Sequence, residues 1–182
     1  VVVGRISPVK DYETLIRAVA LVIESGKISR KIRVTVVGGA GLPEQEKYLE
    51  DLKLLVADLK LDDVVDFVGP RANTEILSFL QSADLFVNTS LTGSLDKAML
   101  EAMACGVPVL TCNEAMEEVL GKEASNFMFE KKDFHGLAGK ITELLNLNNI
   151  DQTFIGQSLR QNVIKNHNIA GLITKIITTF NL

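Results

Sequence analysis

The stretch IRVTVVGGAGLP at residues 32–43 sets the expected fold. Its first half is largely β-branched, which favours a buried strand, and Gly38 and Gly39 follow where that strand should end. Pro43 suits the first turn of a helix, and an apolar repeat through Leu59 would hold that helix on a core. A strand, a glycine turn and an amphipathic helix in this order predict one βα unit.

The same alternation continues along the rest of the chain. Further strands are expected at residues 1–3, 64–68, 85–88, 107–110 and 127–129, and further helices at 12–25, 73–81, 95–104, 115–120 and 134–145. Short apolar runs that alternate with helical patterns are typical of a parallel sheet. We therefore expect an α/β fold: a Rossmann-like parallel sheet of about six strands with helices on both faces. Residues 1–182 should form a single domain, to which 150–182 contribute terminal helices.

Composition restricts the class of protein. Hydrophobic residues make up 47% and charged residues 23% of the 182, which is a globular balance. Nineteen Lys and Arg against 23 Asp and Glu give a net charge of −4 without a basic cluster, which argues against a nucleic-acid partner. No apolar run reaches the roughly 18 residues of a membrane span. Cys105 and Cys112 are interpreted as small buried hydrophobes. These features favour a cytoplasmic protein, with peripheral membrane attachment of a full-length protein left open.

The chain opens on Val1-Val2-Val3-Gly4, a buried-strand pattern without an initiator methionine. A domain seldom starts in the middle of its core, so we expect the chain to be a fragment of a longer protein.

Glycines follow several of the expected strands. Gly4, Gly38, Gly39 and Gly69 come directly after strands that should run parallel, so they should lie at one edge of the sheet. Open parallel sheets bind ligands outside the carboxyl ends of their strands, and glycine allows a close approach to the backbone. Each glycine taken singly is also typical of an ordinary turn, and that alternative stays open.

Two cations follow the first strand. Arg5 and Lys10 are five residues apart, and Pro8 stiffens the loop between them, so both heads can converge on one anion. A guanidinium binds phosphate through two hydrogen bonds and an ammonium adds a point charge. The alternative is a pair of solvated surface charges.

A second candidate constellation lies in residues 93–109. Ser94 is expected to cap a helix that begins near Leu95, which would leave the amides of its first turn to bind an anion. Lys97 and Glu101 lie one helical turn apart and suit a plain salt bridge. If that face meets the sheet edge, the Glu101 carboxylate would instead accept hydrogen bonds from vicinal hydroxyls, such as those of a ribose.

Four segments in this order resemble one protein family. They are Gly4-Arg5 with Lys10, Val37-Gly38-Gly39, Asp66-Phe67-Val68-Gly69 and the stretch from Leu100 to Pro108. They are similar to the carboxyl-terminal, donor-binding half of retaining GT-B glycosyltransferases of group 1 (family 4 type), from residue 1 to about 145. The resemblance implies a hexosyltransferase that binds a nucleoside-diphosphate sugar and transfers the sugar with retention. It also implies that no metal or other cofactor is needed, and that the acceptor (a sugar, lipid or protein) lies on an amino-terminal domain. The fragment alone should be inactive.

The resemblance also implies roles for individual residues. Arg5 and Lys10 match the pair that holds the donor's diphosphate and stabilises its departure, so they are the expected catalytic residues. Glu101 matches the glutamate that binds the ribose, and Pro70 and Arg71 match the segment that contacts the base. The remaining residues expected in the donor site are Gly4, Gly38, Gly39, Gly93, Ser94, Leu95, Asp96 and Lys97.

One departure from the family pattern keeps other functions open. The family places a first glutamate eight residues before the second, at the start of a Glu-Gly-Phe-Gly turn, whereas this chain has Gly93-Ser94-Leu95-Asp96. Asp96 can replace the lost carboxylate, three residues later in the turn. The alternative is a degenerate nucleotide-binding or regulatory module without catalysis. A dinucleotide-binding oxidoreductase domain is a further alternative, although Glu44 stands where the third glycine of Gly-x-Gly-x-x-Gly would be.

The end of the chain predicts an amphipathic last helix. Its apolar stripe consists of Ile169, Leu172, Ile173, Ile176, Ile177 and Phe180. The simplest expectation is that the stripe packs on this domain's own core. The alternative is that it braces the amino-terminal half, in which case these side chains would be exposed here.

Overall fold

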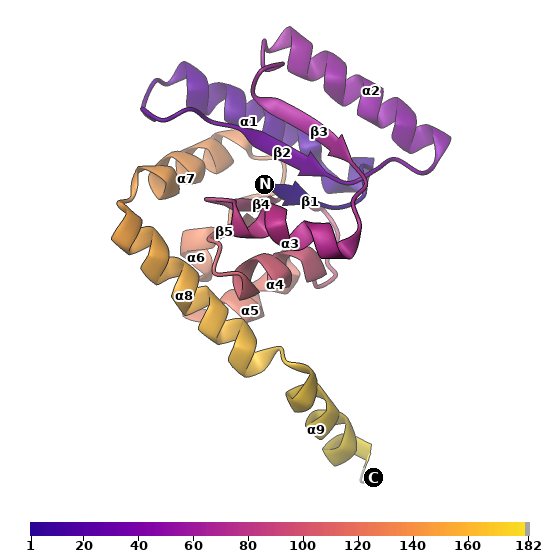
Figure 1. Cartoon of the computed structure of the whole chain (residues 1–182), viewed down its shortest axis with the longest axis vertical. Helices are drawn as coiled ribbons and strands as arrows, with labels where there is room; N and C mark the ends of the chain where they lie inside the picture. Colours follow the sequence, from indigo (N-terminus) through magenta and orange to yellow (C-terminus); the bar gives the residue numbers. More distant parts are fainter. Residues whose placement is uncertain (181–182) are drawn as a thin grey trace.

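The computed structural model describes residues 1–180, apart from the side chains of Ile169, Ala170, Lys175 and Phe180. Its strands are β1 (Val2–Val3), β2 (Val34–Val37), β3 (Val65–Gly69), β4 (Phe86–Asn88) and β5 (Val109–Thr111). Its α-helices are α1 (Tyr12–Glu24), α2 (Pro43–Asp58), α3 (Asn73–Gln81), α4 (Lys97–Ala104), α5 (Glu117–Leu120), α6 (Ala124–Phe127), α7 (Phe134–Asn146), α8 (Asn149–Asn166) and α9 (Ile169–Phe180). Short 3-10 turns lie at η1 (Pro8–Lys10), η2 (Glu114–Met116) and η3 (Gly121–Glu123). Figure 1 shows their arrangement.

The strands in the described part of the chain form two parallel sheets, not the expected single sheet of about six strands (Figure 1). β2 lies between β1 and β3 in one sheet, and β4 pairs with β5 in the other. The sheets meet at β1 and β4, where the Val1 ammonium donates to the Leu85 carbonyl at 2.7 Å. The Val87 amide donates to the Val1 carbonyl at 3.0 Å. The strand order across this join is 3-2-1-4-5, and β1 is only two residues long.

The expectation of a strand at residues 127–129 is also wrong. Phe127 ends the short helix α6, and Met128 forms an isolated parallel bridge with Thr111 at the end of β5. The Phe129 amide donates to the Thr111 carbonyl at 3.0 Å. The chain therefore follows β5 for one bridge only, because α6 takes up the residues that would begin a sixth strand.

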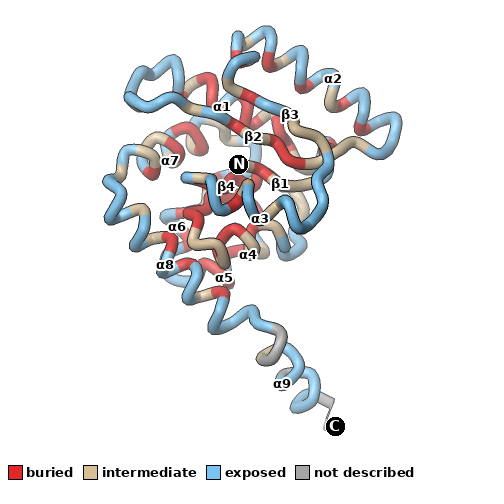
Figure 2. Tube along the Cα trace, in the orientation of Figure 1, coloured by how far each residue is buried: buried red, intermediate tan, exposed pale blue. Residues whose placement is uncertain are grey.

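The helices pack in two groups. α1 contacts α2 and α7, whereas α4 contacts α3 and α8. Parallel crossovers are right-handed, so the connections β1–β2–β3 and β4–β5, which run in opposite directions across the sheets, place their helices on opposite faces. The α/β class with helices around parallel strands is thus confirmed. Figure 2 shows the buried residues concentrated on the strands and on the helix faces that meet them.

The last two helices differ in how they pack. Leu159 and Val163 of α8 are buried, and Gly156 brings this helix backbone to backbone against Gly106 at the end of α4. By contrast, α9 projects from the rest of the molecule (Figures 1 and 2). Its described apolar side chains are 44–56% exposed: Leu172, Ile173, Ile176 and Ile177. The expectation that this stripe packs on the domain's own core is wrong for these four, while Ile169 and Phe180 lie outside the described side chains.

Candidate functional site

The carboxyl ends of the strands meet at one edge, as the sequence predicted. The Gly4 amide donates to the Val37 carbonyl at 2.9 Å, and the Gly38 amide donates to the Gly69 carbonyl at 3.0 Å. These bonds tie the loops after β1, β2 and β3 together. The loops after β4 and β5 leave from the same edge because both strands are parallel as well. The candidate site is therefore built from five loops that are far apart in the sequence.

Gly38 and Gly39 serve the packing of these loops. A Cβ atom on Gly38 would overlap the Gly4 carbonyl oxygen, and the φ angle of Gly38 is +155°. A Cβ on Gly39 would lie 3.3 Å from the Pro70 ring. Gly38 allows close contact between two backbone segments, and Gly39 allows close contact with the Pro70 ring. This role explains them whether or not a ligand also approaches the edge.

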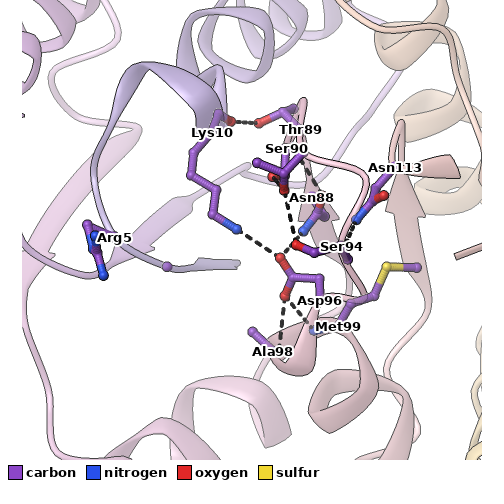
Figure 3. Close-up of polar contacts among 12 residues, drawn as sticks. Arg5, Lys10, Asn88, Thr89, Ser90, Ser94, Asp96, Ala98, Met99 and Asn113 are labelled. Atoms are coloured by element: carbon purple, nitrogen blue, oxygen red, sulfur yellow. Dashed lines mark hydrogen bonds and ion pairs between the residues drawn. The ribbon is translucent and has the colours of Figure 1, made fainter. Parts of the chain in front are cut away.

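Lys10 reaches from the loop after β1 toward the start of α4. It ends η1, and the next residue, Asp11, turns the chain into α1 with a left-handed φ of 47°. The Lys10 ammonium lies 2.9 Å from the nearer carboxylate oxygen of Asp96, and the side chain is 25% exposed. The Thr89 hydroxyl donates to the Lys10 carbonyl at 2.6 Å. Two loops separated by almost 80 residues thus hold this ammonium at the sheet edge (Figure 3).

Arg5 is placed differently. Its side chain is exposed, and among the described residues it has no hydrogen bond or ion pair. Figure 3 shows it apart from Lys10 and from the residues around Asp96. Of the two predicted cations, the structure brings only Lys10 to the start of α4.

The start of α4 corrects one expectation. Asp96, not Ser94, is the N-cap: one of its carboxylate oxygens accepts from the Ala98 amide at 3.0 Å and from the Met99 amide at 3.3 Å. The expectation that these amides are free to bind an anion is therefore wrong in this structure, because the Asp96 carboxylate occupies them. The other carboxylate oxygen of Asp96 receives the Lys10 ammonium (Figure 3).

Buried polar residues behind Asp96 were missed by the sequence reasoning. The Asn88 amide group donates to Asp96 at 2.7 Å, and the Asn88 carbonyl oxygen accepts from the Ser90 amide at 3.1 Å. The Asn113 amide group donates to the Ser94 carbonyl at 2.7 Å, which fixes the turn before α4. Asn88 is 4% exposed and Asn113 is fully buried. The signal in the sequence is an asparagine at the end of one strand and another shortly after the next.

The other predicted site residues lie around this network. Gly93, Ser94 and Leu95 form an exposed turn, and no atom lies within 4 Å of where a Cβ on Gly93 would be. Pro70 and Arg71 are exposed after β3. Lys97 and Glu101 form the i,i+4 pair at 3.4 Å that the sequence suggested as the alternative to a ribose contact, and 44% of the Glu101 side chain stays exposed.

Burial controls the protonation of nearby groups. Desolvation raises the pKa of the Tyr12 hydroxyl, which keeps it a donor to the Gly4 carbonyl at 3.2 Å. Burial also raises the pKa of the Cys112 thiol to about 11, so this thiol is not a nucleophile at neutral pH. Within the described residues, no group of three His, Cys, Asp or Glu side chains is placed to hold a metal ion. None of the described helices is both long and apolar enough for a membrane span.

The fold and the site define an α/β domain with a partly buried Lys10–Asp96 ion pair at the carboxyl edge of its parallel strands. The family model of glycosyl transferases group 1 matches residues 1–168. The chain therefore belongs to the group 1 glycosyltransferases, and the resemblance seen in its sequence is confirmed.

Relatives and solved structures agree with this assignment. A D-inositol 3-phosphate glycosyltransferase of Saccharomonospora viridis is 37% identical over 111 residues, which are 59% of this chain and 25% of that protein. The corresponding enzyme 2 of Catenulispora acidiphila is 38% identical over 112 residues, again 59% of this chain and 25% of the relative. The matches thus span about a quarter of the length of these relatives.

The structural neighbours support the GT-B fold. Anabaena HepE in complex with UDP and glucose superposes with a TM-score of 0.84 at 23% identity, over 99% of this chain and 48% of that chain. The catalytic domain of cholesterol-α-glucosyltransferase from Helicobacter pylori gives a TM-score of 0.72 at 24% identity, over 90% of this chain and 96% of that one. At these identities the likeness concerns the fold alone.

Proposed function

We propose that this chain is the donor-binding domain of a retaining hexosyltransferase and binds a nucleoside-diphosphate sugar. The observation that carries the proposal is the Lys10 ammonium, held at the carboxyl edge beside the start of α4 in a chain of this family. The UDP in the HepE complex supports a nucleoside diphosphate as the ligand. The acceptor and the completing amino-terminal domain belong to the longer protein.

Transfer of the sugar depends mainly on stabilising the diphosphate as it leaves. When the bond between the sugar and the diphosphate breaks, negative charge builds up on the departing oxygen, and preorganised cations lower the energy of that state. Lys10 supplies one fixed positive charge. Arg5, whose side chain is exposed on the same loop, supplies a second once it turns toward the phosphate. The sugar would then be attacked on the face from which the diphosphate departs, which gives retention, and no metal ion is required.

The ribose and the base would contact other residues at the same edge of the sheet. The exposed part of the Glu101 carboxylate accepts hydrogen bonds from ribose hydroxyls, in exchange for its weak surface pair with Lys97. Pro70 and Arg71 provide a flat ring and a guanidinium after β3 for the base. The protein carrying this domain would work in the cytoplasm, where nucleotide sugars are available.

Calorimetric titration of the chain with UDP, GDP and ADP tests the proposal. We expect at least one nucleoside diphosphate to bind, and Lys10→Met to weaken that binding by about ten- to a hundredfold, as for a lost charge-assisted hydrogen bond. Lys53→Met, which removes an exposed charge on α2, is the matched control and should leave affinity unchanged. Binding of NAD without any nucleoside diphosphate would reject the transferase domain in favour of a dinucleotide-binding one.

Gly93 supports a second candidate function, a nucleotide-binding module without catalysis. It stands where the family carries its first glutamate, and the space around it is open enough for a larger side chain. The two candidates differ in the longer protein: sugar transfer that is lost in Lys10→Met supports the enzyme, and nucleotide binding without any transfer supports the module.

A further inference from the structure

The Asp96 carboxylate occupies the best anion-binding position at the sheet edge. Four donors converge on it: the Lys10 ammonium at 2.9 Å, the Asn88 amide group at 2.7 Å, and the backbone amides of Ala98 and Met99 at 3.0 and 3.3 Å. An ammonium together with the first amides of a helix is a combination that also binds phosphate. Only 9% of Asp96 is exposed, so the chain's own carboxylate fills this position.

This arrangement conflicts with a phosphate contact at Lys10. The ion pair cancels the positive charge of Lys10, and a diphosphate brought beside it would meet the carboxylate at close range. Two negative groups a few ångströms apart repel strongly where water is partly excluded. Therefore the two anions compete for the same donors, and the nucleotide gains Lys10 only as Asp96 gives it up.

The turn before Asp96 is open to solvent, but its backbone is held in place. Gly93, Ser94 and Leu95 are exposed, and the bond from the Asn113 amide group to the Ser94 carbonyl holds the backbone of this turn. Lys10 keeps 25% of its side chain exposed, so a ligand can reach the ammonium although Asp96 itself is buried. Relative to the Glu-Gly-Phe-Gly turn, this chain has moved its carboxylate from the first position of the turn to the fourth, directly beside Lys10.

Resting on the proposed function, we propose that Asp96 is an internal counter-ion that competes with the donor's diphosphate for Lys10. Asp96 acts through Lys10 and is a positioning residue. It keeps the ammonium in place beside α4, weakens the hold on the diphosphate, and so favours release of the nucleotide after transfer.

The test compares nucleotide affinity after removal of the carboxylate charge. Asp96→Ser keeps a hydroxyl that caps α4 but is too short to pair with Lys10, and Asp96→Asn keeps the shape. Titrated with UDP, GDP and ADP, both variants should bind the preferred nucleotide about three- to tenfold more tightly than wild type, as expected for removal of a competing ion pair. Asp84→Asn removes the same charge from an exposed pair with Arg30 ahead of β4 and should leave the affinity unchanged.

The Lys10→Met background separates competition from general repulsion. If Asp96 competes for Lys10, Asp96→Ser no longer raises the nucleotide affinity when it is combined with Lys10→Met. The two substitutions would then be strongly coupled in a double-mutant cycle. Thermal unfolding of each variant checks that the fold is kept, and Asp96→Asn serves if Asp96→Ser does not fold.

Three results would overturn the inference. Equal or weaker binding by both Asp96 variants would leave Asp96 as a helix cap or as a support for Lys10. Tightening that persists in the Lys10→Met background would exclude competition at Lys10. Absence of nucleotide binding by wild type and every variant would instead remove the proposed function, and the inference with it.

Discussion

At Gly38 the loop after β2 passes so close to the loop after β1 that a Cβ atom would overlap the Gly4 carbonyl oxygen. We expect Gly38→Ala to lower the free energy of unfolding by about 1–3 kcal/mol, because one of the loops must move. Gly93→Ala is the control: nothing lies within 4 Å of its Cβ, and its effect should stay within about 0.5 kcal/mol. Urea unfolding measures both, and equal effects would contradict the close approach.

Cys112 gives a prediction for alkaline pH. Burial raises the pKa of its thiol to about 11 from 9.0, so the folded protein keeps this proton to a higher pH than the unfolded chain does. The contribution of this group to stability is thus complete below pH 9 and is lost as the pH rises toward 11. In urea unfolding, the stability difference between wild type and Cys112→Ala should narrow across this window. If the stabilities of wild type and Cys112→Ala instead change in parallel with pH, the thiol has the same pKa in the folded and the unfolded protein.

The site residues illustrate what sequence alone can and cannot give. Lys10 and the glycines were predicted because strand ends can be located from apolar runs, and parallel strands bring those ends to one edge. The cap of α4 was assigned to Ser94 because both Ser94 and Asp96 have acceptable capping side chains. Contacts with Lys10, which lies 86 residues earlier in the chain, and with Asn88 favour Asp96 as the cap. Such a choice depends on tertiary contacts, which local sequence rules do not contain.

Among the elements, α8 includes one very close backbone contact with the end of α4. Gly156 lies against the Gly106 carbonyl, where a Cβ atom would overlap the oxygen. We expect Gly156→Ala to separate α8 from α4 and to cost about 1–3 kcal/mol of unfolding free energy. Gly139→Ala in α7 is a matched helical control without any atom within 4 Å, and it should stabilise the protein by about 0.5–1 kcal/mol. Chemical denaturation measures the change in unfolding free energy for both variants, and opposite signs distinguish the packing effect from helix propensity. Changes of the same sign would contradict the close contact at Gly156.

The strand pattern was the most predictable level of structure, and its edges were the least predictable. β2 and β5 each begin two residues later than their apolar runs, at Val34 and Val109. Apolar runs continue into the loops because those residues are also buried or half-buried, as Val107 and Ile32 are. Hydrogen bonding to a neighbouring strand, not hydrophobicity, decides where a strand begins. For the same reason Phe127 and Phe129 read as part of a strand, although Met128 makes a single bridge.

For the whole molecule, the two-sided α/β architecture followed from the order of elements, whereas the position of α9 did not. An amphipathic stripe predicts that a helix packs somewhere, but it carries no information about the partner surface. Leu172 and Ile173 are 56% and 51% exposed, so within the described residues the stripe has little cover. The two relatives described above extend well beyond their matched segments. We propose that this chain is likewise part of a longer protein, and we expect the stripe to pack against the further part.

This expectation can be tested by measuring the stability of two variants, both in the 182-residue chain and in the longer protein. In the 182-residue chain, replacing Leu172 and Ile176 together by serine should change the unfolding free energy by less than about 0.5 kcal/mol, because both side chains are already about half exposed. Leu159→Ala on α8, which removes a buried side chain, should cost about 2–5 kcal/mol and reports what real packing contributes. In the longer protein the double serine variant should become destabilising, since the stripe is then covered. A large loss already in the 182-residue chain would mean that α9 packs on its own domain in solution, and no loss in the longer protein would mean that the stripe faces water there as well.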